Sequence, residues 1–109
     1  EVPKAHVVLP QTPDYAEPVW HLYVVRSKQR TELQRHLQSC GVSTIIHYPI
    51  PPHRQACYQH AHFGPLPIAE RLAEEVLSLP MSPALQQQEV DAVVQGVLSF
   101  EAASARSAA

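Results

Sequence analysis

The sequence predicts an α/β fold: a two-layer sandwich in which a small three-stranded sheet packs against about three helices. Short runs of β-branched and aromatic residues alternate with longer segments whose apolar residues recur with helical periodicity. The length of 109 residues fits one domain with a single core. The hydrophobic fraction of 45% argues against wholesale disorder. Helices with one apolar face can bury that face on a small sheet, which gives two layers.

Residues 1–18 are expected to form an extended lead-in. Proline fixes φ and removes a backbone donor, and prolines recur through this stretch at Pro3, Pro10, Pro13 and Pro18. Such a composition is typical of a connector that leads into a domain. The sequence begins with Glu1 and not with methionine. We therefore expect a piece of something longer, with a naturally short gene as the alternative.

The first strand is predicted over residues 19–26, which are rich in β-branched and aromatic residues. Both of its faces are largely apolar, as in a central strand. Three rings of this strand are expected to pack in the core: Trp20, His21 and Tyr23. The first helix is predicted over residues 30–40, where apolar residues recur at i, i+4 and i+7. Gly41 follows at the position where many helices end in a left-handed conformation.

The second strand is predicted over residues 42–48, which are rich in β-branched residues. Pro49 closes it because proline has no backbone N–H to donate. Residues 49–67 are rich in proline and are expected to form a loop with at most one helical turn, around residues 55–59. Long loops in compact domains are often functional.

The C-terminal part is predicted to hold a helix, a short strand and a second helix. Pro67 suits the first turn of a helix over residues 67–76, and the third strand follows over 76–79. The apolar residues of the last helix fall on one face: Val90, Val93, Val94, Val97 and Leu98. The small domain therefore spans residues 19–100. Residues 101–109 hold no large apolar side chain and are expected to form a disordered tail.

Charge and hydropathy exclude two classes of partner. Eight basic residues are scattered among ten acidic ones, so no basic stripe is available for nucleic acid or for an anionic membrane surface. The longest apolar stretches are far shorter than the ~20 residues that cross a bilayer. Cys40 and Cys57 form no metal or redox motif, so we interpret them as reduced thiols of a cytoplasmic protein. An extracellular disulfide between them is the alternative.

His47 and Tyr48 are the candidate binding residues, because they end an apolar strand where a proline-stiffened loop begins. Strand ends that lead into loops are common positions for functional side chains. Imidazole and phenol groups both donate and accept hydrogen bonds, which suits a polar or phosphorylated ligand. The alternative is that the two side chains cap the strand with satisfied polar tips.

Three other chemistries have weaker support, so no catalytic residue and no metal ligand is predicted. Four histidines lack the regular spacing of zinc ligands: His47, His53, His60 and His62. Cys57 has histidines nearby, but no third group is available to orient one of them. The acidic residues of the helix over 67–76 are expected on its solvated face: Glu70, Glu74 and Glu75.

Four blocks of the sequence carry a family resemblance. Residues 46–58 read Ile-His-Tyr-Pro-Ile-Pro-Pro-His-Arg-Gln-Ala-Cys-Tyr, and residues 76–83 read Val-Leu-Ser-Leu-Pro-Met-Ser-Pro. Residues 20–26 and 66–70 read Trp-His-Leu-Tyr-Val-Val-Arg and Leu-Pro-Ile-Ala-Glu. In this order, the blocks resemble the C-terminal part of the DegT/DnrJ/StrS sugar aminotransferase family. The resemblance covers nearly the whole chain.

The resemblance implies a pyridoxal-phosphate-dependent transferase of fold type I. In that family a large domain binds the cofactor and supplies a Schiff-base lysine, while a small domain closes the pocket at a homodimer interface. The reaction moves an amino group, usually from glutamate, to a nucleotide-linked keto sugar. The family residues that match His47, Tyr48 and His53 lie on the substrate side of the pocket. These three residues are therefore expected to bind substrate.

The chain alone is expected to bind no pyridoxal phosphate and to be inactive. Its two lysines are Lys4, in the lead-in, and Lys28, at a predicted turn. Neither position would desolvate the amine into a Schiff-base nucleophile, and no acidic partner for a pyridinium nitrogen is evident. The expected partner is a large cofactor-binding domain or chain. The alternative functions are a stand-alone binding module that retained this fold and, with less support, a histidine-rich metal-binding module.

Overall fold

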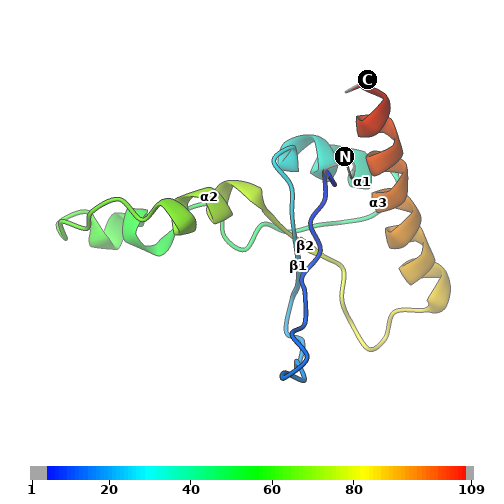
Figure 1. The fold of residues 1–109 in the computed structure, drawn as a ribbon, viewed down its shortest axis with the longest axis horizontal. Coiled ribbons are helices and arrows are strands. Elements are labelled where there is room, and N and C mark those ends of the chain that lie inside the picture. Colours follow the sequence, from blue (N-terminus) through cyan, green and yellow to red (C-terminus); the bar gives the residue numbers. More distant parts are fainter. Residues whose placement is uncertain (1–4, 108–109) are drawn as a thin grey trace.

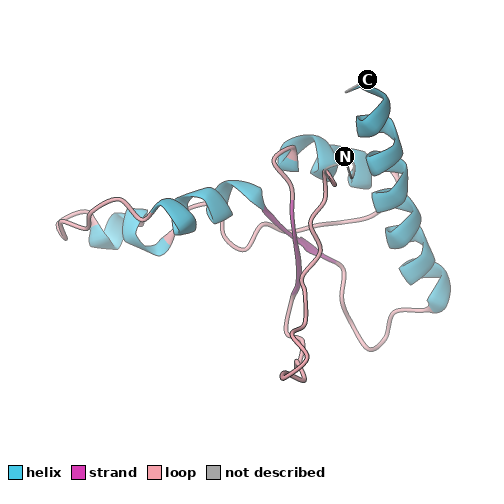
Figure 2. Cartoon of the chain, in the orientation of Figure 1, coloured by secondary structure: helices cyan, strands magenta, loops and turns pink. Residues whose placement is uncertain are grey.

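The computed structural model describes residues 5–107 and shows an α/β chain built around one pair of strands. Strand β1 (Tyr23–Arg26) pairs antiparallel with β2 (Val76–Leu79), and Tyr23 lies opposite Leu79. Valine and leucine dominate both strands, which suits a buried, pleated pair. Helices lie beside this strand pair and a long segment extends away from it (Figure 1; Figure 2). The predicted α/β class is confirmed.

The sheet has two strands in the described part of the chain, not the predicted three. Residues 42–48 contribute a single bridge, in which Ile45 and Ser78 exchange N–H···O bonds of 3.2 and 2.8 Å. Pairing stops on both sides of Ile45 for local reasons. The Val42 N–H is already bonded to the end of the preceding helix, and Pro49 has no N–H to donate.

The strand β1 begins at Tyr23, so its predicted start at Val19 is wrong. The partner strand leads into Pro80, which cannot donate a ladder hydrogen bond. Val19 is 97% exposed, and Trp20, which was expected to anchor the core, is 43% exposed. The Trp20 ring instead packs on Tyr23, with the ring centroids 5.2 Å apart. His21 is also exposed rather than packed in the core.

Helix α1 (Arg30–Ser39) confirms the predicted first helix and the predicted role of the glycine after it. Gly41 has a φ of 78°, a conformation that glycine adopts without a Cβ penalty. Its N–H donates to the Gln38 carbonyl at 3.0 Å, and the Val42 N–H donates to the Leu37 carbonyl at 2.9 Å. This pair of bonds is the Schellman arrangement. Val42 and Leu37 are both buried, so the helix end also joins the core.

The core lies where the strand pair meets α1 and α3 (Gln87–Ser107). Its buried side chains are Val7, Val25, Leu33, Leu37, Val42, Leu77 and Phe100. Gly96 lets α3 approach α1 closely, because a Cβ at this position would lie 2.9 Å from Leu37 Cδ2. None of the helices that the structure describes is long and apolar enough to cross a membrane.

Helix α3 continues through Ser107, further than its predicted end near residue 100. Residues 101–107, which were expected in a disordered tail, are helical because alanine favours the helix and Glu101 anchors this part of it. The Glu101 carboxylate accepts the backbone N–H groups of His6 and Val7, at 3.2 and 2.5 Å. The last helix thereby holds the lead-in, of which residues 1–4 lie outside the described part.

Residues 48–75 form an arm that projects from the strand pair (Figure 1). Two 3₁₀ turns, Pro52–Arg54 and Ala56–Tyr58, occupy the proline-rich segment, so the prediction of at most one helical turn, around residues 55–59, is wrong. Helix α2 (Pro67–Glu75) then returns along the arm and leads directly into β2. Pro67 stands at the start of α2, as predicted, because its missing N–H would be unpaired there in any case.

Candidate functional site

His47 lies just after the Ile45 bridge, where its ring is fixed against β2. Its Nδ1 atom is 2.9 Å from Ser78 Oγ. Ser78 is only 5% exposed and also pairs with Ile45 through its backbone. Ser78 therefore fixes both the backbone that leads to His47 and the orientation of the His47 ring. The other ring nitrogen, Nε2, makes no hydrogen bond to the described residues and is the one available to a ligand.

Tyr48 packs edge-on against His47 and faces solvent. The two ring centroids are 5.4 Å apart, with an angle of 85° between the rings, and the peptide bond that joins the residues is cis. Tyr48 is 69% exposed. His47, but not Tyr48, lines a cavity of about 180 Å³ beside the strand pair, together with His21, Ser43 and Ser78.

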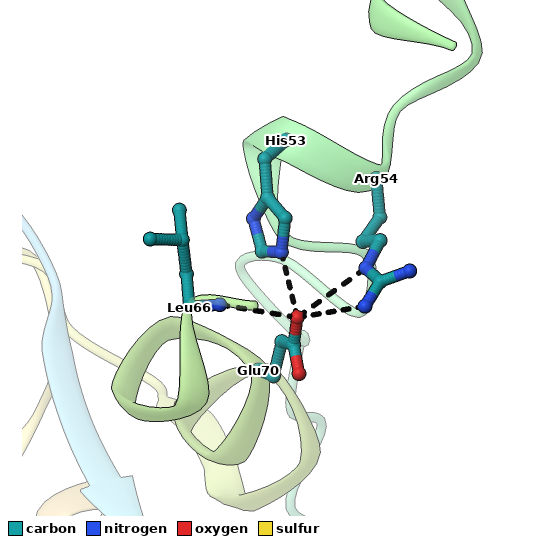
Figure 3. A network of polar contacts seen from close by, with 4 residues as sticks. All are labelled: His53, Arg54, Leu66 and Glu70. Carbon is teal, nitrogen blue, oxygen red and sulfur yellow. Dashed lines mark hydrogen bonds and ion pairs between the residues drawn. The ribbon is translucent and has the colours of Figure 1, made fainter. Parts of the chain in front are cut away.

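His53 belongs to a polar network inside the arm, drawn in Figure 3. Its Nε2 atom donates to Glu70 Oε1 at 2.9 Å. The same oxygen accepts Arg54 Nη2 at 2.9 Å, Arg54 Nε at 3.3 Å and the Leu66 N–H at 3.4 Å. The hydrogen bonds from His53, Arg54 and Leu66, in that order of effect, lower the pKa of Glu70 from its ordinary value of 4.5 to about 2. Glu70 is therefore a carboxylate at neutral pH.

The position of Glu70 explains how it reaches these donors. It lies in the first turn of α2, where backbone N–H groups are unpaired and an acidic side chain is favoured. Its hydrogen bond to the Leu66 N–H joins the residue just before α2 to the first turn of the same helix. Its bonds to His53 and Arg54 tie the first 3₁₀ turn of the arm to α2. This network fastens the two limbs of the arm together.

His53 is nearly enclosed by the arm, with a side chain only 5% exposed. Its second ring nitrogen, Nδ1, is buried and has no hydrogen-bond partner among the described residues. A buried polar atom without a partner is costly unless another group completes its bonding. His53 borders a cavity of about 210 Å³ in the arm, separate from the cavity that His47 lines.

The three predicted site residues are thus divided between two places. His47 and Tyr48 are in contact beside the strand pair, whereas His53 is held in the arm. Sequence reasoning missed Glu70, which it assigned to a solvated face, and Ser78, which it did not consider. The only local signal for Glu70 is an acidic residue in the first turn of a helix. No local signal identifies Ser78, because its partner is 31 residues away.

Pyridoxal phosphate does not fit the residues that the structure describes. Its covalent attachment needs a lysine in a setting that desolvates the amine. Lys28 is exposed and lines an open cleft of about 450 Å³ together with Arg26 and Arg71; Lys4 lies outside the described residues. In the part of the chain that the structure describes, no group of three or more His, Cys, Asp or Glu side chains is placed to hold a metal ion.

A large apolar groove lies on the α3 side of the molecule. Its volume is about 480 Å³, and it is lined by residues before β1, after β2 and along α3. Three of the five residues predicted on the apolar face of α3 are exposed in this groove: Val90, Val94 and Leu98 are 39%, 47% and 55% exposed. Across from them, Leu9 and Met81 are 52% and 40% exposed.

Comparison with known proteins identifies one family. The model of the DegT/DnrJ/EryC1/StrS aminotransferase family matches residues 2–98. A curated relative from Aneurinibacillus thermoaerophilus, dTDP-3-amino-3,6-dideoxy-alpha-D-galactopyranose transaminase, is 45% identical over 89 residues, which are 82% of this chain and 24% of the relative. The chain spans about a quarter of the length of the first curated relatives that it matches.

Solved structures show the same relation. The S. venezuelae DesV, determined in complex with a ketimine intermediate, superposes with a TM-score of 0.85 at 37% identity over 92% of this chain and 28% of that one. The ntda protein from Bacillus subtilis, determined with the bound cofactor PMP, superposes with a TM-score of 0.72 at 28% identity. The match to ntda covers 86% of this chain and 22% of that one.

Proposed function

Because the chain belongs to the DegT/DnrJ/EryC1/StrS aminotransferase family, we propose that it is the C-terminal small domain of a nucleotide-sugar aminotransferase. The enzyme moves an amino group from an amino acid, glutamate, to a keto sugar linked to a nucleotide. Residues 19–100 are the domain, and residues 1–18 connect it to the part that precedes it. The observation that carries the proposal is the superposition on DesV over 92% of this chain.

The names of the relatives support this class of substrate. They include transaminases of dTDP-linked amino sugars and an aminotransferase of a UDP-linked glucosamine. The cofactor of the complete enzyme is pyridoxal phosphate, which supplies the electron sink for moving the amino group. One solved relative holds the bound cofactor PMP.

The chain by itself is inactive under this proposal. The described residues offer no desolvated lysine, since Lys28 is exposed to solvent. The cofactor-binding part must therefore come from another domain or chain. A partner of that kind has a place to bind, because the apolar groove of about 480 Å³ is open along α3.

His47, Tyr48 and His53 are the proposed substrate-side residues. The exposed Tyr48 ring and the free Nε2 of His47 are available to groups outside this chain. The buried, unpartnered Nδ1 of His53 supports a role for this residue too, because the substrate or the missing part can supply the hydrogen-bond partner that it lacks. None of the three is proposed to perform the chemical step.

A chimera tests the proposal. The part of the Aneurinibacillus transaminase that lies outside the match is joined to this chain in place of its own C-terminal quarter. We expect the chimera, supplied with pyridoxal phosphate, to aminate a dTDP-linked keto sugar with glutamate. The 109-residue chain alone should show no activity and should retain no cofactor absorbance after dialysis. Activity of the chain alone, or a well-folded chimera without activity, would contradict the proposal.

The matched control is a chimera that carries Leu77→Asp. Leu77 is fully buried in the core at β2, so a carboxylate at this position prevents the small domain from folding. Loss of activity in this control, with the cofactor still bound by the transaminase part, would show that the activity of the chimera depends on the fold of this chain.

A further inference from the structure

A second histidine, His21, lines the same cavity as His47, although the sequence predicts it to pack in the core. His21 precedes β1, and His47 follows the Ile45 bridge to β2. Both side chains line the same cavity of about 180 Å³, at the end of the strand pair where β1 begins and β2 leads into Pro80. His21 is exposed, so its ring is not committed to the core.

Ser78 determines how the His47 ring is presented to this cavity. Its side chain is bonded to Nδ1 at 2.9 Å, and it is held in the middle of β2 by the reciprocal backbone pair with Ile45. A serine that is 5% exposed in a paired strand has little freedom to move. A hydrogen bond at one ring nitrogen fixes the ring orientation and determines which nitrogen faces a ligand.

The lining of the cavity indicates the chemistry of its ligand. The polar groups are the two imidazoles and the hydroxyls of Ser43 and Ser78, and apolar atoms of Leu79 and Met81 complete the wall. No lysine or arginine lines it, so a phosphate would find none of the cations that usually neutralise it. A neutral sugar ring matches this lining, because its hydroxyl groups can bond to the imidazoles and serines and its apolar C–H surface can pack on Leu79 and Met81.

We propose that His21 and His47 form one subsite for the hydroxyl-bearing sugar ring of the substrate, with Ser78 as the positioning residue for His47. The assignment rests on the proposed function and adds a sugar contact and a positioning residue to it. The subsite makes no contact with the nucleotide phosphates, because no lysine or arginine lines this cavity.

The first test is His21→Ala in the chimera. Loss of one neutral hydrogen bond to the sugar should raise the KM for the keto-sugar nucleotide about twofold to tenfold, while the KM for glutamate stays within about twofold of the parent. The matched control is His62→Ala, which removes an exposed histidine of the arm that does not line this cavity. The control should leave both constants unchanged.

Inorganic phosphate distinguishes a sugar subsite from an anion site. If the subsite binds the sugar, phosphate inhibits the parent and His21→Ala equally. If phosphate inhibits His21→Ala more weakly than it inhibits the parent, the cavity is an anion site and the sugar assignment is overturned. A parental KM for the sugar nucleotide in His21→Ala would overturn the subsite but not the proposed function. A chimera without transaminase activity would overturn both.

The second test concerns Ser78. Ser78→Ala should raise the KM for the sugar nucleotide about twofold to tenfold through a misplaced His47 ring, and Ser78→Thr, which keeps the hydroxyl, should restore it. Ser99→Ala is the matched control, because it breaks another serine–histidine hydrogen bond, the 2.8 Å contact with His36, outside the cavity. A lower melting temperature in Ser78→Ala with parental kinetics would show that Ser78 is only structural.

Discussion

At the scale of single residues, the polar contacts of this chain show which predicted site residues are free and which are committed. His47 keeps one ring nitrogen available because Ser78 binds the other. His53 is held by Glu70, so its Nε2 is not available to a ligand. Glu70 accepts all of its hydrogen bonds through one carboxylate oxygen (Figure 3). The difference between the two histidines lies in their partners and not in their residue type.

The charge of Glu70 should make the arm sensitive to acid. The folded-state pKa of about 2 is below the ordinary 4.5, so this carboxylate stabilises the fold above about pH 4.5, and the contribution is lost as the pH falls towards 2. The melting temperature of the wild type should therefore fall towards that of Glu70→Gln over this range. Circular dichroism melting curves between pH 7 and 2 measure the difference.

The control for this comparison is Glu74→Gln, on the same helix. The Glu74 side chain takes part in none of the hydrogen bonds of the arm network. The difference in melting temperature between Glu74→Gln and the wild type should therefore stay the same as the pH falls from 4.5 to 2. If the gap between wild type and Glu70→Gln stays constant down to pH 2, the Glu70 network does not form in solution.

Substitution of the proposed substrate-side residues should change kinetics and not stability. In the chimera, His47→Asn or Tyr48→Phe removes one hydrogen-bonding group at the substrate. Either change should lower kcat/KM between about twofold and a hundredfold, depending on whether the bond involves a charged group. Melting temperature and nucleotide-sugar kinetics are measured side by side, with cofactor absorbance as a check. A lower melting temperature with parental kinetics would identify the two side chains as structural.

At the scale of elements, the close approach of α1 and α3 determines which residues the last helix tolerates. Gly96 lies at the crossing, and Glu101, five residues later, holds the lead-in by accepting two of its backbone N–H groups. The local sequence does not end the helix near residue 100, because the alanines that follow favour helix. Tertiary contacts along α3 therefore determine both its packing and its length.

Gly96→Ala tests this crossing. Alanine favours a helix by about 1 kcal/mol over glycine, but its Cβ would lie 2.9 Å from Cδ2 of the fully buried Leu37, and overpacking of a core costs about 1–3 kcal/mol. We expect a net loss of about 1 kcal/mol in the free energy of unfolding, read from urea denaturation. The exposed neighbour Gln95→Ala should cause no loss, and a Gly96→Ala chain more stable than wild type would contradict the close crossing.

At the scale of the whole molecule, the arm projects away from the strand pair, and the groove along α3 is not covered by any other part of the described chain. The groove along α3 exposes aliphatic side chains on both walls, and apolar patches of this kind drive association. In the proposed enzyme, the cofactor-binding part supplies the cover. In its absence, a second copy of the chain is the available substitute.

The isolated chain should therefore form a weak dimer at high concentration, which sedimentation equilibrium measures. Val94→Glu places a charge in the groove and should raise the dissociation constant at least about tenfold, because a buried unpaired charge is costly. The control is Val19→Glu, since Val19 is 97% exposed outside the groove and its substitution should change nothing. A strict monomer at millimolar concentration, or equal effects of both substitutions, would contradict this use of the groove.

The sequence by itself determined the features that depend on near neighbours. Apolar spacing and a glycine capable of positive φ located α1 and its end, Pro67 marked the start of α2, and residues 76–79 formed the predicted strand. These features follow from backbone sterics and local hydrogen bonding. Sequence blocks also indicated the family, which the family model then matched over residues 2–98.

Only the tertiary structure decided which distant groups meet. It reduced the segment over residues 42–48 to the Ile45 bridge and left three of the five apolar-face residues of α3 exposed in an open groove. It also joined Ser78 to His47 and Glu70 to His53, across 31 and 17 residues. Periodicity shows that a face is apolar and residue type shows that a group can bond. Neither specifies the partner, because the partner depends on how the whole chain packs.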